Sequence, residues 1–194
     1  IPQIQAVFGL SGGGMAISNG LSDFVFMEQD KAKVFVNSPN AINGNSQDKN
    51  DFSSAKFQSE STGLVDFIGT ESEIISGIRE LISVLPANNE DDMSYIECTD
   101  DLNRLTPELE SRISDPALAL NSISDSGYVL EVKKNFAREM FTGFIRLNGN
   151  TVGVVANRRA LYDENGEIAD EFENVLSHQG SDKAAGFVEF CDAF

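Results

Sequence analysis

The stretch best suited to binding or catalysis is the glycine-rich run Gly9–Gly20, which contains three successive glycines. An apolar segment with strand composition, Ile4–Phe8, precedes the run, and Met15–Ser22 has the composition of a short helix. Successive glycines permit positive φ angles and leave no Cβ to keep a ligand away from the backbone. Where a helix starts, unpaired N–H groups and the positive end of its dipole suit an oxyanion or a phosphate.

The same run also has a purely structural interpretation, because glycines between a strand and a helix often form a tight turn. Neither common nucleotide-binding pattern fits it. No Gly-Lys-Ser/Thr follows, and Ile17 occupies the position where the dinucleotide motif needs its third glycine. By itself, the run therefore leaves both anion binding and tight packing open.

The overall charge restricts the classes of partner that the protein can bind. The 194 residues carry a formal net charge of −17, which argues against a surface for nucleic acid or anionic membrane, since both need clustered Lys and Arg. No apolar run approaches the roughly 20 residues of a membrane span. The basic residues that could form a local exception, and that we expect to be solvated surface charges, are Lys133, Lys134, Arg158, Arg159 and Lys183.

The other residues that could take part in catalysis or metal binding give weaker signals. Cys98 and Cys191 lie far apart without a CxxC spacing, which predicts two inert, buried thiols in a reducing cytoplasm. His178, the only histidine, is expected in a polar surface loop, and no Ser-His-Asp grouping can be assembled around it. The acidic segment Ala87–Asp101 lacks the alternating pattern of a calcium loop, so we predict no metal site.

Hydrophobic periodicity predicts the elements that must position these residues. Met140–Leu147 and Thr151–Ala156, joined by a turn containing Asn148 and Gly149, predict a hairpin. The clearest helix ends at Pro86 and carries an apolar stripe that we predict to belong to the core, formed by Ile74, Ile75, Ile78, Leu81, Ile82 and Leu85. Further helices are expected at Thr106–Glu110, capped by Thr106, at Pro116–Ile123 and at Asp182–Phe194, and Leu161–Ser177 is expected to be irregular.

The periodicity breaks at Pro86, which suggests a division of the chain. We predict an α/β protein with domains at residues 1–86 and 106–194, joined by an acidic connector at residues 87–105. The sequence starts inside a strand pattern and stops inside a helical one. We therefore expect an internal fragment of a longer protein.

Five stretches resemble the biotin-dependent acyl-CoA carboxyltransferases, in the order that family shows. They are Gly9–Met27, Val34–Pro39, Asp101–Leu109, Gly143–Asn157 and Ser181–Phe194. Asp101–Leu109 is similar to the family's inter-domain pattern D-R-L-x-P-E-L. The family includes propionyl- and acetyl-CoA carboxylases and methylmalonyl- and glutaconyl-CoA decarboxylases, and the finest resemblance is to methylmalonyl-CoA decarboxylase α chains.

This resemblance implies a crotonase-like ββα superhelix, in which residues 1–86 end the N-terminal domain and residues 106–194 begin the C-terminal one. It also implies that the N–H groups of Gly13 and Gly14 hold the thioester oxygen of an acyl-CoA as that oxygen becomes an enolate. The residues expected to contact the substrate are Gly12, Ser11 and Ser38.

The resemblance implies partners as well. The acyl-CoA belongs to the propionyl/methylmalonyl or acetyl/malonyl class, and the carboxyl group travels on biotin attached to a separate carrier protein. Other carboxylase or decarboxylase subunits, further copies of the same subunit and a cytoplasmic location are expected, with a position at the membrane periphery if the subunit serves a decarboxylase pump.

The sequence departs from the family pattern at three places. Gln58 stands near the position where many carboxylases have a histidine, Leu161–Asn174 is longer and more acidic than usual, and the sequence stops before the family's second oxyanion loop. The fragment alone is therefore expected to lack transferase activity. The alternatives are a crotonase-like hydratase or thioester hydrolase that works without biotin, and a non-enzymatic docking domain whose glycine loop is only a turn.

Overall fold

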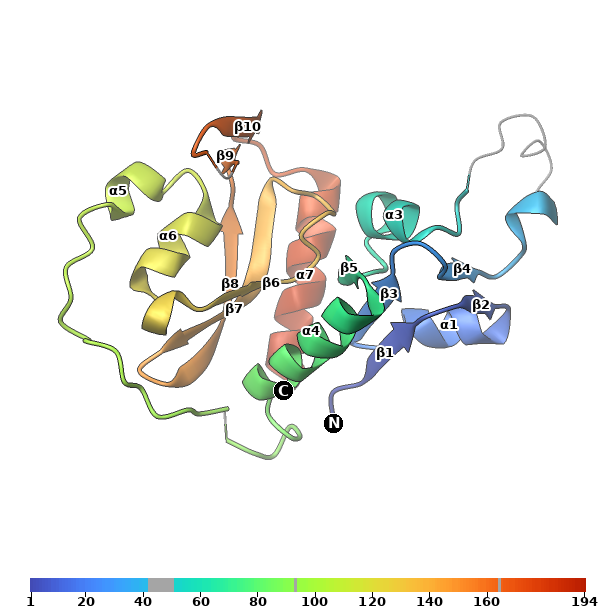
Figure 1. Cartoon of the computed structure of the whole chain (residues 1–194), viewed down its shortest axis with the longest axis horizontal. Coiled ribbons are helices and arrows are strands. Elements are labelled where there is room, and N and C mark those ends of the chain that lie inside the picture. Colours follow the sequence, from blue (N-terminus) through green and yellow to red (C-terminus); the bar gives the residue numbers. More distant parts are fainter. Residues whose placement is uncertain (42–50, 93, 164) are drawn as a thin grey trace. The chain divides into compact units, whose positions relative to one another are not determined.

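The computed structural model describes residues 1–41, 51–92, 94–163 and 165–194, and Figure 1 shows its helices and strands. The chain forms two compact units, Ile1–Ile82 and Ser83–Phe194. The second unit includes the segment 87–105 that the sequence suggested as a connector. Assignment of the two units to two crotonase-like domains stays a prediction. Within the described residues, no helix is both long and apolar enough to cross a membrane.

The first unit is built from short parallel strands and the helices that connect them. Strands β1, β3 and β5 form one sheet in the order β1-β3-β5, while β2 and β4 form a second parallel pair. Its elements are β1 (Ile4–Val7), β2 (Leu10–Gly12), α1 (Gly14–Gly20), β3 (Phe24–Glu28), β4 (Lys33–Phe35), η1 (Pro39–Ala41), α3 (Ala55–Phe57), η2 (Gln58–Thr62), β5 (Phe67–Gly69) and α4 (Glu71–Val84).

Strand β3 is the centre of this unit, and all five of its residues are buried. It lies between β1 and β5 and is covered on both faces, as is usual for a parallel strand. On one face, Val25 and Met27 join an aliphatic cluster with Val7 and Val34. On the other, the Phe26 ring lies against Gly77 of α4, where an added Cβ would be 3.1 Å from the ring.

Helix α4 starts with a reciprocal cap. The Thr70 hydroxyl accepts the Glu73 N–H at 3.3 Å, and the Glu73 carboxylate accepts the Thr70 N–H at 2.7 Å and its hydroxyl at 2.8 Å. The hydrogen bond from the Thr70 backbone holds the pKa of Glu73 below its usual value. The sequence pattern Thr-x-x-Glu therefore fixes where this helix begins.

The buried face of α4 is narrower than the predicted stripe. Ile74 and Leu81 are buried, whereas Ile75 and Ile82 are exposed. The prediction that all six apolar side chains of the stripe belong to the core is wrong at these two positions. Ile74 and Leu81 lie two helical turns apart on the same side of α4. Only this edge of the stripe therefore packs into the core.

The second unit is built on an antiparallel sheet in the order β6-β7-β8. Figure 1 shows α6 and α7 on either side of this sheet, and α7 places Phe187 against Phe144 of β7 with ring centroids 5.1 Å apart. The elements are α5 (Leu109–Arg112), α6 (Pro116–Ile123), η3 (Asp125–Gly127), β6 (Val129–Glu131), β7 (Met140–Leu147), β8 (Asn150–Asn157), β9 (Ala160–Tyr162), β10 (Ile168–Glu171) and α7 (His178–Ala193).

The β7–β8 turn is the one that the sequence predicts. Asn148 and Gly149 have φ angles of 50° and 79°, as a two-residue hairpin turn requires. The Asp125 carboxylate accepts both of their N–H groups, at 3.0 Å and 2.6 Å. The predicted connector is hydrogen-bonded to the same hairpin. The Ile96 N–H donates to the Gly149 carbonyl at 2.9 Å, and the Thr151 N–H donates to the Ser94 carbonyl at 3.2 Å.

Several sequence expectations for this unit need correction. Helix α6 spans the predicted residues, with Asp115 as its cap, but α5 begins at Leu109 and Thr106 does not cap it. His178 opens α7 and does not lie in a loop, because Ser177 caps the helix one residue earlier. The segment expected to be irregular contains the antiparallel pair β9–β10.

We expect the substitution Leu81→Ala to lower the free energy of unfolding by about 2–5 kcal/mol, because Leu81 is fully buried and truncation leaves a cavity. Ile75→Ala, on the exposed side of the same helix, is the matched control and should change stability by less than about 1 kcal/mol. Urea unfolding measures both. Equal losses for the two variants would show that the assignment of the buried face is wrong.

Candidate functional site

The glycine loop joins β2 to α1 through an unusual backbone conformation. Gly12 ends β2, and Gly13 follows with φ 60° and ψ −126°, a combination that side chains with a Cβ rarely adopt. The Gly13 N–H donates to the Phe35 carbonyl of β4 at 3.0 Å. Gly13 therefore completes the β2–β4 pairing and then reverses the chain so that the helix can start at Gly14.

This geometry shifts the open donors by one residue from those predicted. The Gly13 N–H is engaged by Phe35, so it is not free to meet a ligand. Ala16 and Ile17 donate to the Gly13 carbonyl at 3.1 Å and 3.4 Å. Within the described part of the chain, the N–H groups of Gly14 and Met15 have no hydrogen-bond partner. Adjacent open donors at a helix start can stabilise an oxyanion.

The predicted substrate contacts behave differently from one another. Ser11 is buried, and its hydroxyl accepts the Asn19 side-chain amide at 3.0 Å, so it supports α1 from inside the unit. A Cβ at Gly12 would lie 3.0 Å from the Phe35 ring, so that glycine permits close packing. Ser38 is exposed and its carbonyl accepts the Ala41 N–H at 2.8 Å. No contact among the described residues joins Ser38 to the glycine loop.

Space and apolar surface surround the two open donors. A Cβ added at Gly14 would meet no atom within 4 Å, so a ligand can approach this part of the backbone. Two neighbouring apolar side chains are largely exposed, Leu10 at 78% and Met15 at 66%. The site therefore combines two N–H donors with an apolar rim, an arrangement that suits a thioester better than a polyanion.

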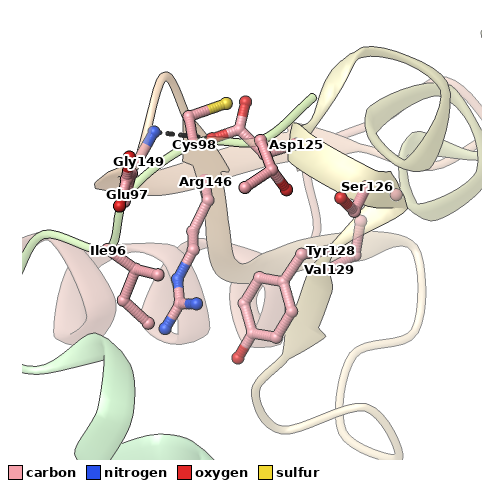
Figure 2. Close-up of a pocket in the computed structure, with 11 residues that line it drawn as sticks. Ile96, Glu97, Cys98, Asp125, Ser126, Tyr128, Val129, Arg146 and Gly149 are labelled. Atoms are coloured by element: carbon pink, nitrogen blue, oxygen red, sulfur yellow. Dashed lines mark hydrogen bonds between the residues drawn. The ribbon is translucent and has the colours of Figure 1, made fainter. Parts of the chain in front are cut away.

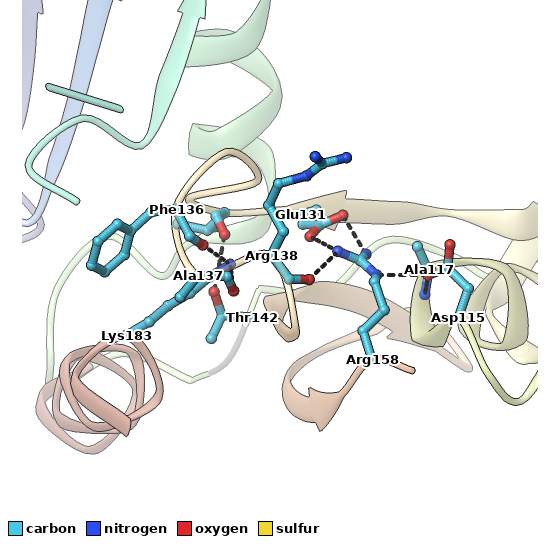
Figure 3. A network of polar contacts seen from close by, with 10 residues as sticks. Asp115, Ala117, Glu131, Phe136, Ala137, Arg138, Thr142, Arg158 and Lys183 are labelled. Atoms are coloured by element: carbon cyan, nitrogen blue, oxygen red, sulfur yellow. Dashed lines mark hydrogen bonds and ion pairs between the residues drawn. The ribbon is translucent and has the colours of Figure 1, made fainter. Parts of the chain in front are cut away.

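Two of the expected surface cations are buried in the second unit (Figure 3). Arg158 is 2% exposed and donates to Asp115 at 3.0 Å and to both carboxylate oxygens of Glu131 at 2.9 Å each. Burial by itself lowers the pKa of Arg158, but the bonds to Glu131 and Asp115 raise it overall. Lys183 is 3% exposed. The expectation of solvated charges is wrong for both residues, which are internal supports of the fold.

A cavity that the sequence did not suggest lies in the second unit (Figure 2). Its volume is about 450 Å³, within the range of ligand pockets. Its two charged side chains at the hairpin already hold the structure together: Asp125 binds the hairpin turn, and Arg146 lies 4.9 Å from the Tyr128 ring centroid and donates to the Ser83 carbonyl at 3.0 Å. The walls come from three separated segments, which is why no local pattern predicted the cavity.

The remaining chemical candidates do not assemble into a site. Cys98 is partly exposed where it lines the cavity, and Cys191 is exposed, so the expectation of two buried thiols is wrong. His178 is exposed and lies 3.4 Å from the Asp182 carboxylate. Among the described residues, no group of three His, Cys, Asp or Glu side chains could hold a metal ion. The glycine loop is therefore the strongest candidate site.

The carboxyl transferase domain family matches residues 1–194, the whole chain. The chain belongs to this family. It is 32% identical to the propionyl-CoA carboxylase carboxyltransferase subunit of Haloferax mediterranei and 32% identical to the methylmalonyl-CoA decarboxylase α subunit of Propionigenium modestum, in both cases over 205 aligned residues. All of the chain is covered, but only 38% of either relative.

A solved structure supports the same assignment. Transcarboxylase 12S, a hexamer with methylmalonyl-CoA and methylmalonic acid bound, superposes with a TM-score of 0.83 at 31% identity and covers 100% of this chain and 37% of its own. The predicted α/β, crotonase-like carboxyltransferase fold is thereby confirmed. The resemblance to the acyl-CoA carboxyltransferases, on which the predicted fold was based, is also confirmed.

Replacing Arg158 by Met should destabilise the second unit by about 3–5 kcal/mol, because the carboxylates of Asp115 and Glu131 would stay buried without their partner. Arg159→Met is the matched control, since the neighbouring side chain is exposed, and it should cost less than about 1 kcal/mol. Chemical unfolding of both variants provides the measurement. A loss as small for Arg158→Met as for Arg159→Met would contradict the role of the network.

Proposed function

We propose that the glycine loop is the enolate-stabilising part of an acyl-CoA carboxyltransferase site in a longer subunit. The observation that carries the proposal is the pair of adjacent open N–H groups at Gly14 and Met15, next to exposed apolar surface. Membership in the carboxyl transferase family supports it. The acyl-CoA belongs to the propionyl/methylmalonyl class, as in the names of the relatives.

The chain's own residues act on the acyl-CoA. Removal of a proton from the carbon next to the thioester places negative charge on the thioester oxygen, and the N–H groups of Gly14 and Met15 can hold that oxygen. Because the donors belong to a backbone fixed by the β2–β4 pairing, they need no reorganisation as the charge develops. Carboxylated biotin on a separate carrier protein supplies the carboxyl group and the base in this proposal.

Gly13 and Phe35 have supporting roles. Gly13 sets the turn, and Phe35 accepts the Gly13 N–H and packs its ring against Gly12. Ser11 holds Asn19, in the last turn of α1, through its side-chain hydroxyl. The predicted pair of donors, Gly13 and Gly14, thus becomes the pair Gly14 and Met15 in the proposal.

The proposal extends to the parent protein. The chain spans about 38% of the length of the curated relatives, so the second half-site, the biotin carrier, other carboxylase or decarboxylase subunits and assembly into a homo-oligomer belong to the parent subunit. The relative transcarboxylase 12S is a hexamer, which supports an oligomer. We also place the parent protein in the cytoplasm, where free thiols such as Cys98 and Cys191 stay reduced.

Gly14→Pro in the full-length parent subunit tests the proposed donor directly. Gly14 is the first residue of α1, a position where proline suits a helix, so the substitution removes one N–H with little strain. We expect turnover of acyl-CoA to fall about 10²–10³-fold, the usual effect of losing one oxyanion donor. Steady-state transfer of labelled carboxylate measures it.

Ile17→Ala is the control, because this exposed residue of α1 lies outside the proposed donor pair and the change keeps every N–H of the loop. It should retain most of the parental activity, and circular dichroism should show that both variants are folded. Parental turnover by folded Gly14→Pro would rule out this donor. Turnover of the acyl-CoA without any carboxyl donor would favour a hydratase or hydrolase, and no acyl-CoA binding at all would favour a docking domain.

A further inference from the structure

The Lys183 side chain ends inside the second unit, on the inner side of the turn between β6 and β7 (Figure 3). Its Nζ donates to the Phe136 carbonyl at 2.8 Å and lies 3.5 Å from the Ala137 carbonyl. Only 3% of the residue is exposed. A lysine so deeply buried is rare unless a carboxylate pairs with it.

No carboxylate pairs with Lys183 among the described residues. Both oxygens of Glu131 bind Arg158 at 2.9 Å, and the Glu139 carboxylate accepts the Ser177 hydroxyl. The charges that face Nζ are those of Glu131 on β6, Glu139 before β7, Lys133 in the turn and Arg158 after β8. Burial, opposed by Glu131 and reinforced by Arg158, lowers the pKa of Lys183 to about 8.

The turn that Lys183 supports has a strained backbone. Lys133 and Ala137 have φ angles of 53° and 42°, in the left-handed region that residues with a Cβ rarely adopt. Two hydrogen bonds within the turn hold this shape: the Phe136 N–H donates to Lys133 at 3.0 Å, and the Met140 N–H donates to Ala137 at 2.9 Å. The far end of the turn is tied to Arg158, which donates to the carbonyls of Arg138 at 3.0 Å and Glu139 at 2.6 Å. Around Phe136 and Ala137, the hydrogen-bonded support from outside the turn among the described residues is Lys183, so local opening is expected in this part, where the backbone is strained.

We propose that Lys183 makes the turn Lys133–Met140 a pH-sensitive element, closed when the amine is neutral and prone to open when it carries a proton. The neutral amine has two N–H groups, enough for the carbonyls of Phe136 and Ala137. The protonated form is buried without a counterion, so it gains hydration if the turn opens and the side chain reaches water.

The direction of the pH dependence follows from this. In the open turn Lys183 has the pKa of an ordinary lysine, about 10.4, which is higher than in the closed turn. Between about pH 8 and that value, the open form holds a proton that the closed form lacks. Closing is therefore favoured more strongly as the pH rises, by up to tenfold per pH unit. Below about pH 8 both forms are protonated and the dependence disappears.

Hydrogen exchange at the amides of Phe136 and Met140 tests the proposal, because these two N–H groups close the turn. Their opening equilibrium, corrected for intrinsic exchange, would be followed by quenched flow from pH 7 to 10 in the 194-residue chain. We expect a fall of several-fold to tenfold per pH unit above pH 8. Lys134→Met, a change at the exposed neighbouring lysine, should show the same fall, and Lys183→Met should show none.

The same pH dependence in Lys183→Met, or no dependence in the parent chain, would overturn the proposal. If Lys183→Met does not fold, the parent chain still decides the question through nuclear magnetic resonance of its labelled lysine side chains. Titration of Lys183 with a midpoint near pH 8, together with a change in the turn amides at the same pH, supports the proposal. A midpoint at the value of an exposed lysine contradicts it.

Discussion

The hydrogen bond from the Gly13 N–H to the Phe35 carbonyl is the constraint on which the candidate site depends. It extends the β2–β4 pairing by one residue, to the point where the backbone turns into α1. The Gly13 N–H is bonded to the sheet. The next two backbone N–H groups, those of Gly14 and Met15, are therefore the ones without a partner among the described residues. The Phe35 ring packs against Gly12, so one residue of β4 positions the loop through both its backbone and its side chain.

Buried polar groups hold the second unit in a comparable way. The chain carries a net charge of −17, yet two of its cations are inside. Arg158 has carboxylate partners from two elements, while Lys183 has only carbonyls. The difference matters because a satisfied buried charge fixes the fold, whereas an unpaired one makes the local structure depend on protonation.

Local sequence signals predicted the elements that local chemistry determines. The turn at Asn148-Gly149 follows from the φ angles that these residue types tolerate, and α6 follows from Pro116 at a helix start. The glycine loop was located for the same reason. These patterns alone do not specify a family, and the resemblance supplied the one to which the chain belongs.

Features that depend on residues far apart in the sequence could not be predicted from local patterns. Phe35, on another strand, accepts the Gly13 N–H, so the donor pair that we propose is Gly14 and Met15, in place of the Gly13 and Gly14 predicted from the sequence. Arg158 and Lys183 looked like surface charges because their partners, Glu131 and the Phe136 carbonyl, are remote in sequence. Exposed Ile75 similarly reflects packing of α4 that periodicity does not specify.

The most direct test of the account is amide hydrogen exchange at Gly13, Gly14 and Met15, resolved to single residues, with and without a stable acyl-CoA enolate analogue. The account predicts that Gly13 is protected in both states, through its bond to Phe35, and that Gly14 and Met15 exchange quickly until the analogue binds. Protection of Gly14 and Met15 in the free protein, or a response to the analogue at Gly13 alone, would contradict it.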